Sequence, residues 1–329
     1  MATVRLMETA QQRARAVRFD RYGDRSVLYV ADVPMPIPAD GEVLVSIRAA
    51  AINPGETSIR TGALHERFPA TFPSGEGTDL AGVVTEVGAD VVDFAVGDEV
   101  LGFSWTRSSH ATHAAVPASQ LILKPDSLDW ETAGSLAVAG CAAYAAVRAV
   151  GAQAGETVAV SAAAGGVGGI VVQLLAAKGV RVLGIASSSN DKWLSDHGAI
   201  AVNYGERLGE RLLARAPQGV DAFIDLFGPE YVELAAAIGV PPARIETIIA
   251  FEKARELGAK AEGGASASTR EVLGELASLV TAGQLRIDIA ATYPLDDVAD
   301  AFAELEQRHT RGKIVLLPSL PAPSSQGTQ

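Results

Sequence analysis

A glycine-rich turn at residues 161–168 constrains the fold of this 329-residue chain more than any other feature. It reads Ser-Ala-Ala-Ala-Gly-Gly-Val-Gly, follows an apolar run at 157–161 and opens a helix-like run at 168–178. A strand, a glycine turn and a helix in this order are typical of dinucleotide-binding units. In such a unit Gly165 lets the backbone approach a pyrophosphate, and Gly168 lets the helix pack closely on the strand.

The pattern of this turn departs in one place from the usual one. It reads A-x-x-G-x-x-G, so Ala162 stands where the first glycine usually lies. A glycine-rich turn that binds no ligand is the alternative interpretation, and the second strand that follows the helix argues against it. We therefore predict that a dinucleotide cofactor contacts Ala162, Gly165, Gly166, Val167 and Gly168.

Apolar runs alternate with helical stretches from residue 126 to residue 264. Runs of Val and Ile without polar alternation are typical of strands buried on both faces, as in a parallel sheet covered by helices on both sides. The sequence therefore predicts an α/β, doubly wound Rossmann domain with a six-stranded parallel sheet. Its strands are expected at 157–161, 180–186, 200–204, 220–226 and 244–251, with a weaker one at 258–263.

Residues 15–125 differ from this block, because they consist of short strand-like runs broken by Gly, Pro or Asp. They predict a β-rich domain. Two helices and two strands follow at 265–318, and we assign them to this same domain, so that 126–264 is an inserted block. Residues 1–14 are expected to form an N-terminal extension, and residues 319–329, rich in Pro, Ser and Gln, a flexible tail.

Charge and cysteine content exclude several classes of function. The chain has 27 Lys and Arg against 39 Asp and Glu, and the resulting net charge of −12 would repel nucleic acid. Cys141 is the only cysteine, so neither an intrachain disulfide nor a thiolate zinc cluster can form. The first residues lack the apolar core of a signal peptide, and the glycines within the uncharged stretch 157–177 argue against a membrane span. We expect a cytoplasmic protein that binds neither nucleic acid nor membrane.

The residues after the second strand of the α/β block decide between two nicotinamide cofactors. An acidic residue there binds the ribose hydroxyls of NAD, whereas the 2′-phosphate of NADPH needs hydroxyl donors and a cation. Ser187 and Ser188 follow the strand, and Lys192 lies nearby. We predict that these residues bind the 2′-phosphate of NADPH. Asp191 offers the alternative of an NADH site.

Four stretches carry a resemblance to a known family. They read Arg-Ala-Val-Arg-Phe-Asp at 15–20, Ala-Ala-Ile-Asn-Pro at 50–54, and Thr-Asp-Leu-Ala-Gly-Val-Val at 78–84 with Gly-Asp-Glu-Val at 97–100; the glycine turn is the fourth. From Arg15 to Pro318 the chain resembles the zinc-independent quinone oxidoreductase branch of the medium-chain dehydrogenase/reductase superfamily. The resemblance implies a GroES-like catalytic domain, a Rossmann domain, a cleft between them and a homodimer. It also implies NADPH-dependent hydride transfer to a quinone or to the C=C bond of an α,β-unsaturated carbonyl compound.

The resemblance also bears on zinc. Zinc-dependent relatives place a cysteine close to the position of Asn53 and Gly-His-Glu at the position of residues 77–79, which read Gly-Thr-Asp here. His110 and His113 are three residues apart, but no soft third ligand accompanies them, so we expect no metal. Hydrogen-bond donors must then stabilise the charge that develops on the oxygen of the acceptor.

Asn53 matches the cleft asparagine of the family and is the candidate catalytic residue. Its amide would orient the nicotinamide ribose or the substrate oxygen, and an Asx turn before Pro54 is the alternative. Ser58 and Ile59 stand where the family usually has tyrosine, so the proton is expected to come from solvent. The predicted substrate-cleft residues are Thr57, Ser58, His65 and Cys141.

Further cofactor contacts follow from the resemblance and from the rule that ligands bind at the carboxyl ends of parallel strands. Tyr204 resembles the family tyrosine that contacts the 2′-phosphate; a half-buried tyrosine at a strand end is the alternative. Lys313 matches a family motif near the chain end, for which a structural role is one interpretation. The residues expected against the nicotinamide half are Phe227, Ala250 and Phe251.

Cys141 is expected near the start of a helix that lines the cofactor cleft. A helix N-terminus there would lower the pKa of its thiol. Free cysteines are usually buried, however, so an inert buried thiol is the favoured interpretation.

Two alternatives for the function remain open. One is an enoyl-thioester reductase of a fatty-acid or polyketide pathway, which the missing tyrosine argues against. The other is an NADPH-binding structural or regulatory protein without enzymatic activity, since fold alone does not fix function.

Overall fold

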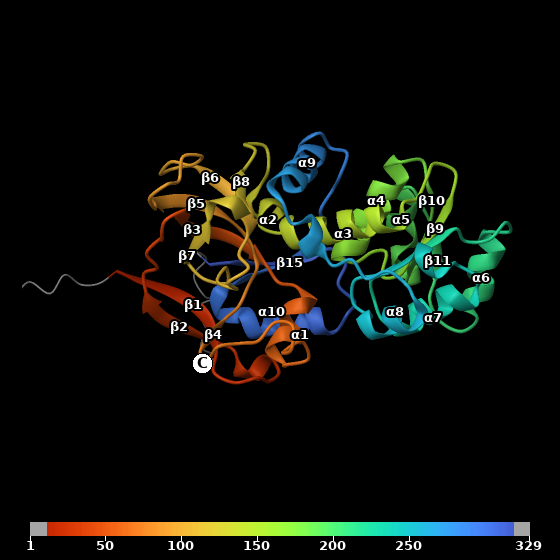
Figure 1. Ribbon diagram of the computed structural model, residues 1–329, viewed down its shortest axis with the longest axis horizontal. Helices are drawn as coiled ribbons and strands as arrows, with labels where there is room; N and C mark the ends of the chain where they lie inside the picture. Colours follow the sequence, from red (N-terminus) through yellow and green to blue (C-terminus); the bar gives the residue numbers. More distant parts are fainter. Residues whose placement is uncertain (1–11, 319–329) are drawn as a thin grey trace, which may run out of the picture.

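The computed structural model describes residues 12–318, which form a β-rich lobe and an α/β lobe side by side (Figure 1). The predicted tail at 319–329 and most of the predicted N-terminal extension lie outside the described residues. The boundary expected at residue 14 is wrong by two residues, because the first strand, β1 (Arg13–Phe19), already includes Arg13 and Ala14. Ala14 is buried there and faces the core, which anchors the start of the strand.

The β-rich lobe contains two sheets. A three-stranded sheet has the order β2-β1-β4, and a larger one has the order β14-β15-β3-β5-β6-β8, with β7 paired to β3. The chain thus returns to this lobe after the α/β block, as predicted, because the two last strands extend its larger sheet. The remaining strands are β2 (Tyr29–Pro34), β3 (Glu42–Ala51), β4 (Ser74–Gly75), β5 (Asp79–Val87), β6 (Glu99–Phe103), β7 (His113–Pro117), β8 (Leu121–Leu123), β14 (Ile289–Pro294) and β15 (Lys313–Leu317).

Two short helices of this lobe carry residues of the candidate site. The helix α1 (Pro54–Arg60) begins right after β3, where Asn53 is its N-cap and Pro54 its first residue. Proline suits the first helical position because its missing N–H would have no partner there. The helix α10 (Val298–Glu306) buries Val298, Ala301 and Phe302 in one cluster with β1 and β15.

The α/β lobe contains a parallel sheet of five strands in the order β11-β10-β9-β12-β13. The prediction of a sixth strand is wrong for the described residues: of the stretch 258–263, only Lys260 forms an isolated bridge, with Glu246. The run expected at 244–251 is also shorter, because Phe251 opens a helix. The strands are β9 (Thr157–Val160), β10 (Arg181–Ala186), β11 (Ala199–Asn203), β12 (Ala222–Asp225) and β13 (Ile245–Thr247).

Helices cover this sheet, and all residues of β9 and β12 are buried, as their uninterrupted apolar runs indicated. The helix α9 was assigned to the β-rich domain, but it contacts both α3 and β8 and so joins the two lobes (Figure 1). Among residues 12–318, none of the helices combines the length and apolarity that crossing a bilayer requires. The helices are α2 (Trp130–Ala133), α3 (Ala137–Val150), α4 (Gly166–Ala177), α5 (Asp191–Asp196), α6 (Leu208–Arg215), α7 (Pro229–Ala237), α8 (Phe251–Leu257) and α9 (Arg270–Thr281).

Glu246 makes the stability of the α/β lobe depend on pH. It lies fully buried in the edge strand β13. Burial is the main cause that raises the pKa of Glu246 from 4.5 to about 8; the charge of Glu262 acts in the same direction and that of Lys260 in the opposite one. An acid with a raised pKa holds its proton more tightly in the folded chain. Its contribution to stability is therefore full below the unfolded pKa and is lost as the pH rises through the folded pKa.

We expect Glu246→Gln to remove part of this pH dependence. Between about pH 5 and about pH 8, the free energy of unfolding of the unaltered protein should fall more steeply than that of the variant, by about 1.4 kcal/mol per pH unit. Urea denaturation at a series of pH values measures the difference, and Glu252→Gln, at an exposed position in α8, is the matched control. Parallel pH profiles for the unaltered protein and Glu246→Gln would contradict the expectation.

Candidate functional site

The glycine turn forms a tight loop between β9 and α4. Ala162 adopts a left-handed backbone conformation with φ +47°, and Gly165 is the N-cap of α4. A Cβ atom at Gly168 would lie 2.1 Å from the carbonyl oxygen of Ala162, so only glycine fits this close approach of helix and strand end. The N–H groups of the first turn of α4 have no partners within the helix. Such a cradle fits the pyrophosphate of a nicotinamide cofactor.

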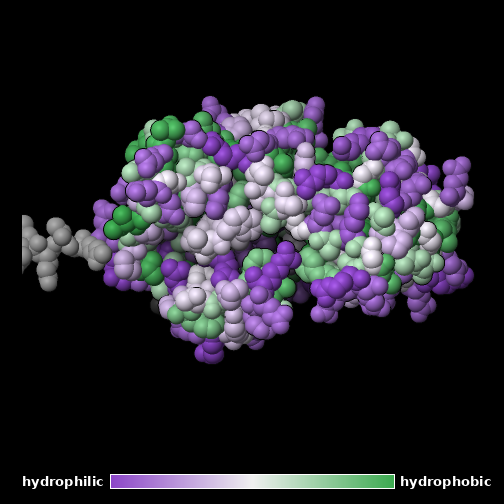
Figure 2. Space-filling model, viewed as in Figure 1, coloured by the Kyte–Doolittle hydropathy of each residue, from purple (hydrophilic) through white to green (hydrophobic). Residues whose placement is uncertain are grey.

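The β-rich lobe lies directly against this loop. Gly165 forms an isolated parallel bridge with Gly312, and the side chain of Trp193 donates a 2.6 Å hydrogen bond to Asp288. Figure 2 shows a recess in the molecular surface where the two lobes meet. A pocket at the loop is lined by residues of both lobes, among them Gly165, Gly166, Trp193, Asp288 and Lys313. The cradle is therefore closed on one side by the segments around 286–288 and 311–313.

The residues predicted to bind the 2′-phosphate gather at the carboxyl end of β10. The hydroxyls of Ser187 and Ser189 are 2.8 Å apart. Lys192 is 86% exposed and pairs with Asp196, and Tyr204, just after β11, is about half exposed. Asp191, the basis of the NADH alternative, accepts a 2.8 Å hydrogen bond from Asn203.

A buried carboxylate that the sequence reasoning missed joins the ends of three neighbouring strands. Asp225, at the end of β12, accepts hydrogen bonds from Ser161 after β9 at 2.8 Å and from Thr247 at the end of β13 at 2.7 Å. It also accepts from the backbone N–H groups of Phe227 and Gly228. Burial raises the pKa of Asp225, while these hydrogen bonds lower it. The available signal was a polar residue at the end of each apolar run.

The hydrogen bonds that Asp225 accepts from the backbone N–H groups of Phe227 and Gly228 hold this segment in place. The guanidinium of Arg308 lies 4.1 Å from the centre of the Phe227 ring and donates a hydrogen bond to the backbone carbonyl oxygen of Phe227. Phe251, at the start of α8, contacts Arg67 of the β-rich lobe at 5.2 Å. Ala250 is the buried N-cap of α8. The residues expected against the nicotinamide half thus lie where the two lobes meet.

Asn53 belongs to a buried polar cluster instead of facing open solvent. Its Oδ1 accepts a 2.5 Å hydrogen bond from Nζ of Lys313, and its Nδ2 donates to Asp79 at 3.1 Å and to Glu56 at 3.4 Å. Glu56 also accepts from the backbone N–H of Asn53 at 2.8 Å, and Asp79 accepts from that of Val138 at 2.7 Å. The side chain of Asn53 thus has a local partner, Glu56, with which it forms a capping box at the start of α1, and two partners from distant segments, Asp79 and Lys313.

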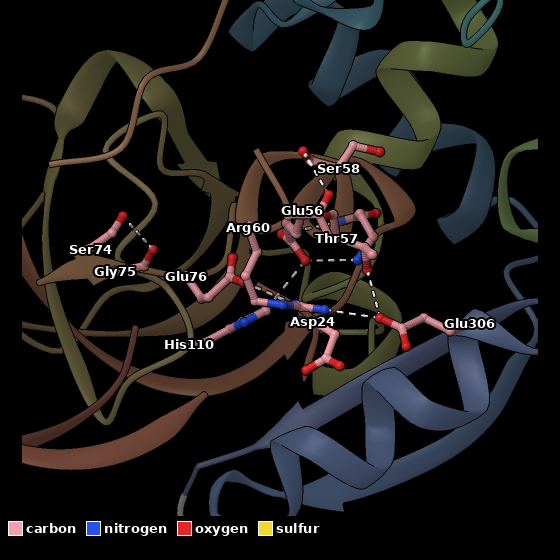
Figure 3. A network of polar contacts seen from close by, with 12 residues as sticks. Asp24, Glu56, Thr57, Ser58, Arg60, Ser74, Gly75, Glu76, His110 and Glu306 are labelled. Carbon is pink, nitrogen blue, oxygen red and sulfur yellow. Dashed lines mark hydrogen bonds and ion pairs between the residues drawn. The ribbon is translucent and has the colours of Figure 1, made fainter. Parts of the chain in front are cut away.

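A second buried group lies beside this cluster (Figure 3). Arg60 is fully buried and pairs with Glu76 at 3.2 Å and with Glu306 at 2.9 Å. Burial and the charge of Glu56 raise the pKa of Glu76 to about 8, although Arg60 acts against both. His110 is also buried, 3.9 Å from Glu56. Across residues 12–318, His, Cys, Asp and Glu side chains do not gather into a set of three or more that could hold a metal ion.

The predicted substrate-cleft residues differ in accessibility. Thr57 and Ser58 are half-buried on α1, and His65 is exposed in the turn that follows it. Cys141 is fully buried in the core shared by α3 and α4, so its expected place on the cleft wall is wrong. The less favoured alternative, a pKa lowered by the helix N-terminus, is wrong, because burial raises the pKa of the Cys141 thiol to about 12. The favoured interpretation, a buried thiol, is confirmed.

Comparisons with known proteins agree with this architecture. Residues 39–160 match the alcohol dehydrogenase GroES-like domain, and residues 198–316 match a zinc-binding dehydrogenase family. The quinone oxidoreductase of Mus musculus is 30% identical over 94% of this chain and 100% of its own length; that of Pseudomonas aeruginosa is 30% identical over 93% and 100%.

Solved structures give the same result. The quinone oxidoreductase from Coxiella burnetii has a TM-score of 0.83 and 30% sequence identity, covering 93% of this chain and 99% of its own. The Escherichia coli quinone oxidoreductase complexed with NADPH has a TM-score of 0.83 and 26% sequence identity, and the match covers 92% of this chain and 100% of the Escherichia coli chain.

Proposed function

Because the chain belongs to the zinc-independent quinone oxidoreductase branch of the medium-chain dehydrogenase/reductase superfamily, we propose that it uses NADPH to reduce a small quinone or an α,β-unsaturated carbonyl compound. In the second case hydride adds to the C=C bond. Similar proteins are named quinone oxidoreductases, and the Escherichia coli enzyme is solved in complex with NADPH.

The observation that carries this proposal is the connection of the glycine turn to Asn53 through residues 312 and 313. The turn lies against Gly312, and the next residue, Lys313, reaches Asn53 through a 2.5 Å hydrogen bond. A cofactor whose pyrophosphate occupies the cradle would therefore extend along the junction of the lobes towards Asn53. Residues from both lobes would then fix its position before an acceptor binds.

The chemistry divides simply between cofactor and protein. A bound reduced nicotinamide supplies a hydride, and the protein supplies binding, orientation and electrostatics. Thr57 and Ser58 lie half-buried on α1 close to Asn53. Their hydroxyls make long hydrogen bonds of 3.4 Å, to Glu306 and to the carbonyl oxygen of Pro54, and would turn from these to donate to the acceptor's oxygen. Since tyrosine is missing at residues 58 and 59, the proton that completes the reduction comes from solvent.

Initial-rate assays with a panel of acceptors test the proposal. We expect the purified protein to oxidise NADPH when a small quinone or enone is added. An enoyl thioester is expected to be a much poorer acceptor, because the tyrosine proton donor typical of the enoyl-thioester reductases in this superfamily is missing at residues 58 and 59. If no quinone or enone in the panel supported turnover, the proposed function would be rejected, and preferred use of the thioester would identify the alternative reductase.

The preference for NADPH is part of the same proposal. Lys192 extends into solvent near Ser187, and its ammonium group could pair with a phosphate in place of the Asp196 carboxylate. We expect Lys192→Ala to raise the Kd for NADPH about tenfold, the loss typical of one charge-assisted hydrogen bond, and to leave the Kd for NADH unchanged. Fluorescence titration measures both constants. Lys178→Ala, at an exposed lysine just after α4, is the control. Tighter binding of NADH than of NADPH by the unaltered protein would contradict this preference and favour the role of Asp191.

We propose a homodimer as well. The edge strand β13 pairs with β12 on one side, and on its other side its backbone bonds to that of Lys260. Beyond Lys260, the partly exposed stretch 258–263 pairs with no strand of the described residues, so a second copy of the chain can pair along it. Light scattering coupled to gel filtration would give twice the mass of the chain if the proposal is right and the mass of one chain if it is wrong. The cytoplasmic location stays a prediction.

A further inference from the structure

Lys313 connects the glycine turn with Asn53 inside the protein. It is the first residue of β15, and its side chain is 5% exposed. The side chain passes over the start of α4, because a Cβ atom at Gly166 would lie 2.8 Å from Cδ of Lys313. Its Nζ then lies 2.5 Å from Oδ1 of Asn53 and 3.4 Å from Oδ2 of Asp79. The closer partner of this ammonium group is thus the neutral amide and not the carboxylate.

The hydrogen-bond partners of Asn53 determine the orientation of its side-chain amide. Its Nδ2 group faces the carboxylates of Asp79 and Glu56, and its oxygen faces the ammonium group of Lys313. An amide turned by half a rotation would place its N–H hydrogens against the ammonium group and its oxygen against two carboxylates. Amide orientation follows from the hydrogen-bond network, and this network allows one orientation.

This orientation limits what Asn53 can do for a ligand. Both amide hydrogens are directed at carboxylates, so the hydrogen-bonding capacity left for a ligand lies on Oδ1, which accepts from Lys313 and also faces the backbone N–H of Glu56 in the capping box. We propose that Lys313 is a positioning residue that fixes Asn53 as a hydrogen-bond acceptor for a hydroxyl of the nicotinamide ribose. Asn53 then does not donate to the oxygen of the acceptor substrate. The inference rests on the proposed function, since it concerns the same cofactor site.

A double-mutant cycle on NADPH binding tests this role. Fluorescence titration gives the Kd for the unaltered protein, Asn53→Ala, Lys313→Met and the double variant. Each single substitution is expected to weaken binding about 10- to 100-fold, the range for loss of a hydrogen bond to a charged or well-oriented partner. Because Lys313 acts through Asn53, the double variant should bind NADPH no more weakly than Asn53→Ala.

Two further measurements separate positioning from a purely structural role. Lys313→Arg keeps a donor for Asn53, so it should restore most of the affinity for NADPH. In Lys313→Met the KM for the quinone should stay unchanged. Lys313→Met also leaves Asp79 buried without a cation, which would destabilise the fold. The same cycle is therefore also run in an Asp79→Asn background, where residue 79 still has an oxygen to accept from Asn53.

Three results would overturn the inference. If the increase in the Kd for NADPH in the double variant equals the product of the two single increases, Lys313 does not act through Asn53. A raised KM for the quinone with an unchanged Kd for NADPH would assign Asn53 to the substrate oxygen. An unaltered protein that binds neither NADPH nor NADH would overturn the proposed function together with the inference. A protein that binds NADPH but reduces no acceptor overturns the proposed function alone, because the cycle is read from binding.

Discussion

Replacing Gly168 by alanine is expected to destabilise the loop by about 1–3 kcal/mol, the usual cost of overpacking, and to raise the Kd for NADPH about 5- to 100-fold as the loop is displaced. The added Cβ would meet three backbone atoms of residues 162 and 163 at 2.1–2.9 Å. Backbone atoms cannot turn aside as a flexible side chain can. The loop between β9 and α4 must therefore shift, and the cradle shifts with it.

Gly274→Ala is the matched control for this substitution. Gly274 lies within α9, and a Cβ atom there would meet no atom within 4 Å. Alanine favours a helix interior over glycine by about 1 kcal/mol, so this variant should be slightly stabilised and bind NADPH normally. Fluorescence titration and thermal denaturation of both variants give the comparison. Unchanged affinity in Gly168→Ala would mean that the cofactor does not use the glycine turn.

Arg60→Met is expected to lower the free energy of unfolding by about 3 kcal/mol, the lower end of the range for breaking a buried ion pair. Arg60 is fully buried, pairs with Glu76 and Glu306, and lies 4.4 Å from the ring centre of Phe302. Glu306 is 25% exposed and can regain water, which keeps the loss below the upper end of that range. Urea denaturation near neutral pH measures the effect.

Glu76→Gln separates the contributions to this loss. Burial and the charge of Glu56 raise the pKa of Glu76 although Arg60 lies beside it, so its carboxyl ionises less readily than usual, and an amide at this position keeps an oxygen that accepts from Arg60. We expect Glu76→Gln to change stability by less than about 1 kcal/mol near pH 7 and to be relatively more stable at higher pH, where the buried carboxyl would ionise. A loss near pH 7 as large as that in Arg60→Met would contradict the account of this buried pair.

Local patterns in the sequence predicted the features that depend on neighbouring residues. The strand, glycine turn and helix at 157–177 are present, and so are the fully buried central strands β9 and β12. The return of the chain to the β-rich lobe after residue 264 was also predicted. The sixth strand failed because the stretch 258–263 is short and rich in Gly and Ala, which leaves little side chain to pack on a sheet.

Contacts between distant residues were beyond local patterns. Asn53, Asp79 and Lys313 meet from three segments, separated by 26 and 234 residues along the chain. Nothing in the neighbourhood of Lys313 indicates that its ammonium group is buried. At Cys141 the position near the start of a helix was predicted correctly, but the effect of burial on the pKa exceeds any effect of the helix N-terminus.

We expect this protein to transfer hydride from a nicotinamide cofactor to a small acceptor without a metal. The decisive measurement is the rate of NADPH oxidation by a quinone after exhaustive dialysis against a strong chelator, with the metal content determined in parallel. Turnover should persist when the bound metal is far below one equivalent per chain, and NADPH that carries deuterium in the transferred position should react more slowly. Loss of turnover on chelation, restored by adding zinc, would contradict this expectation.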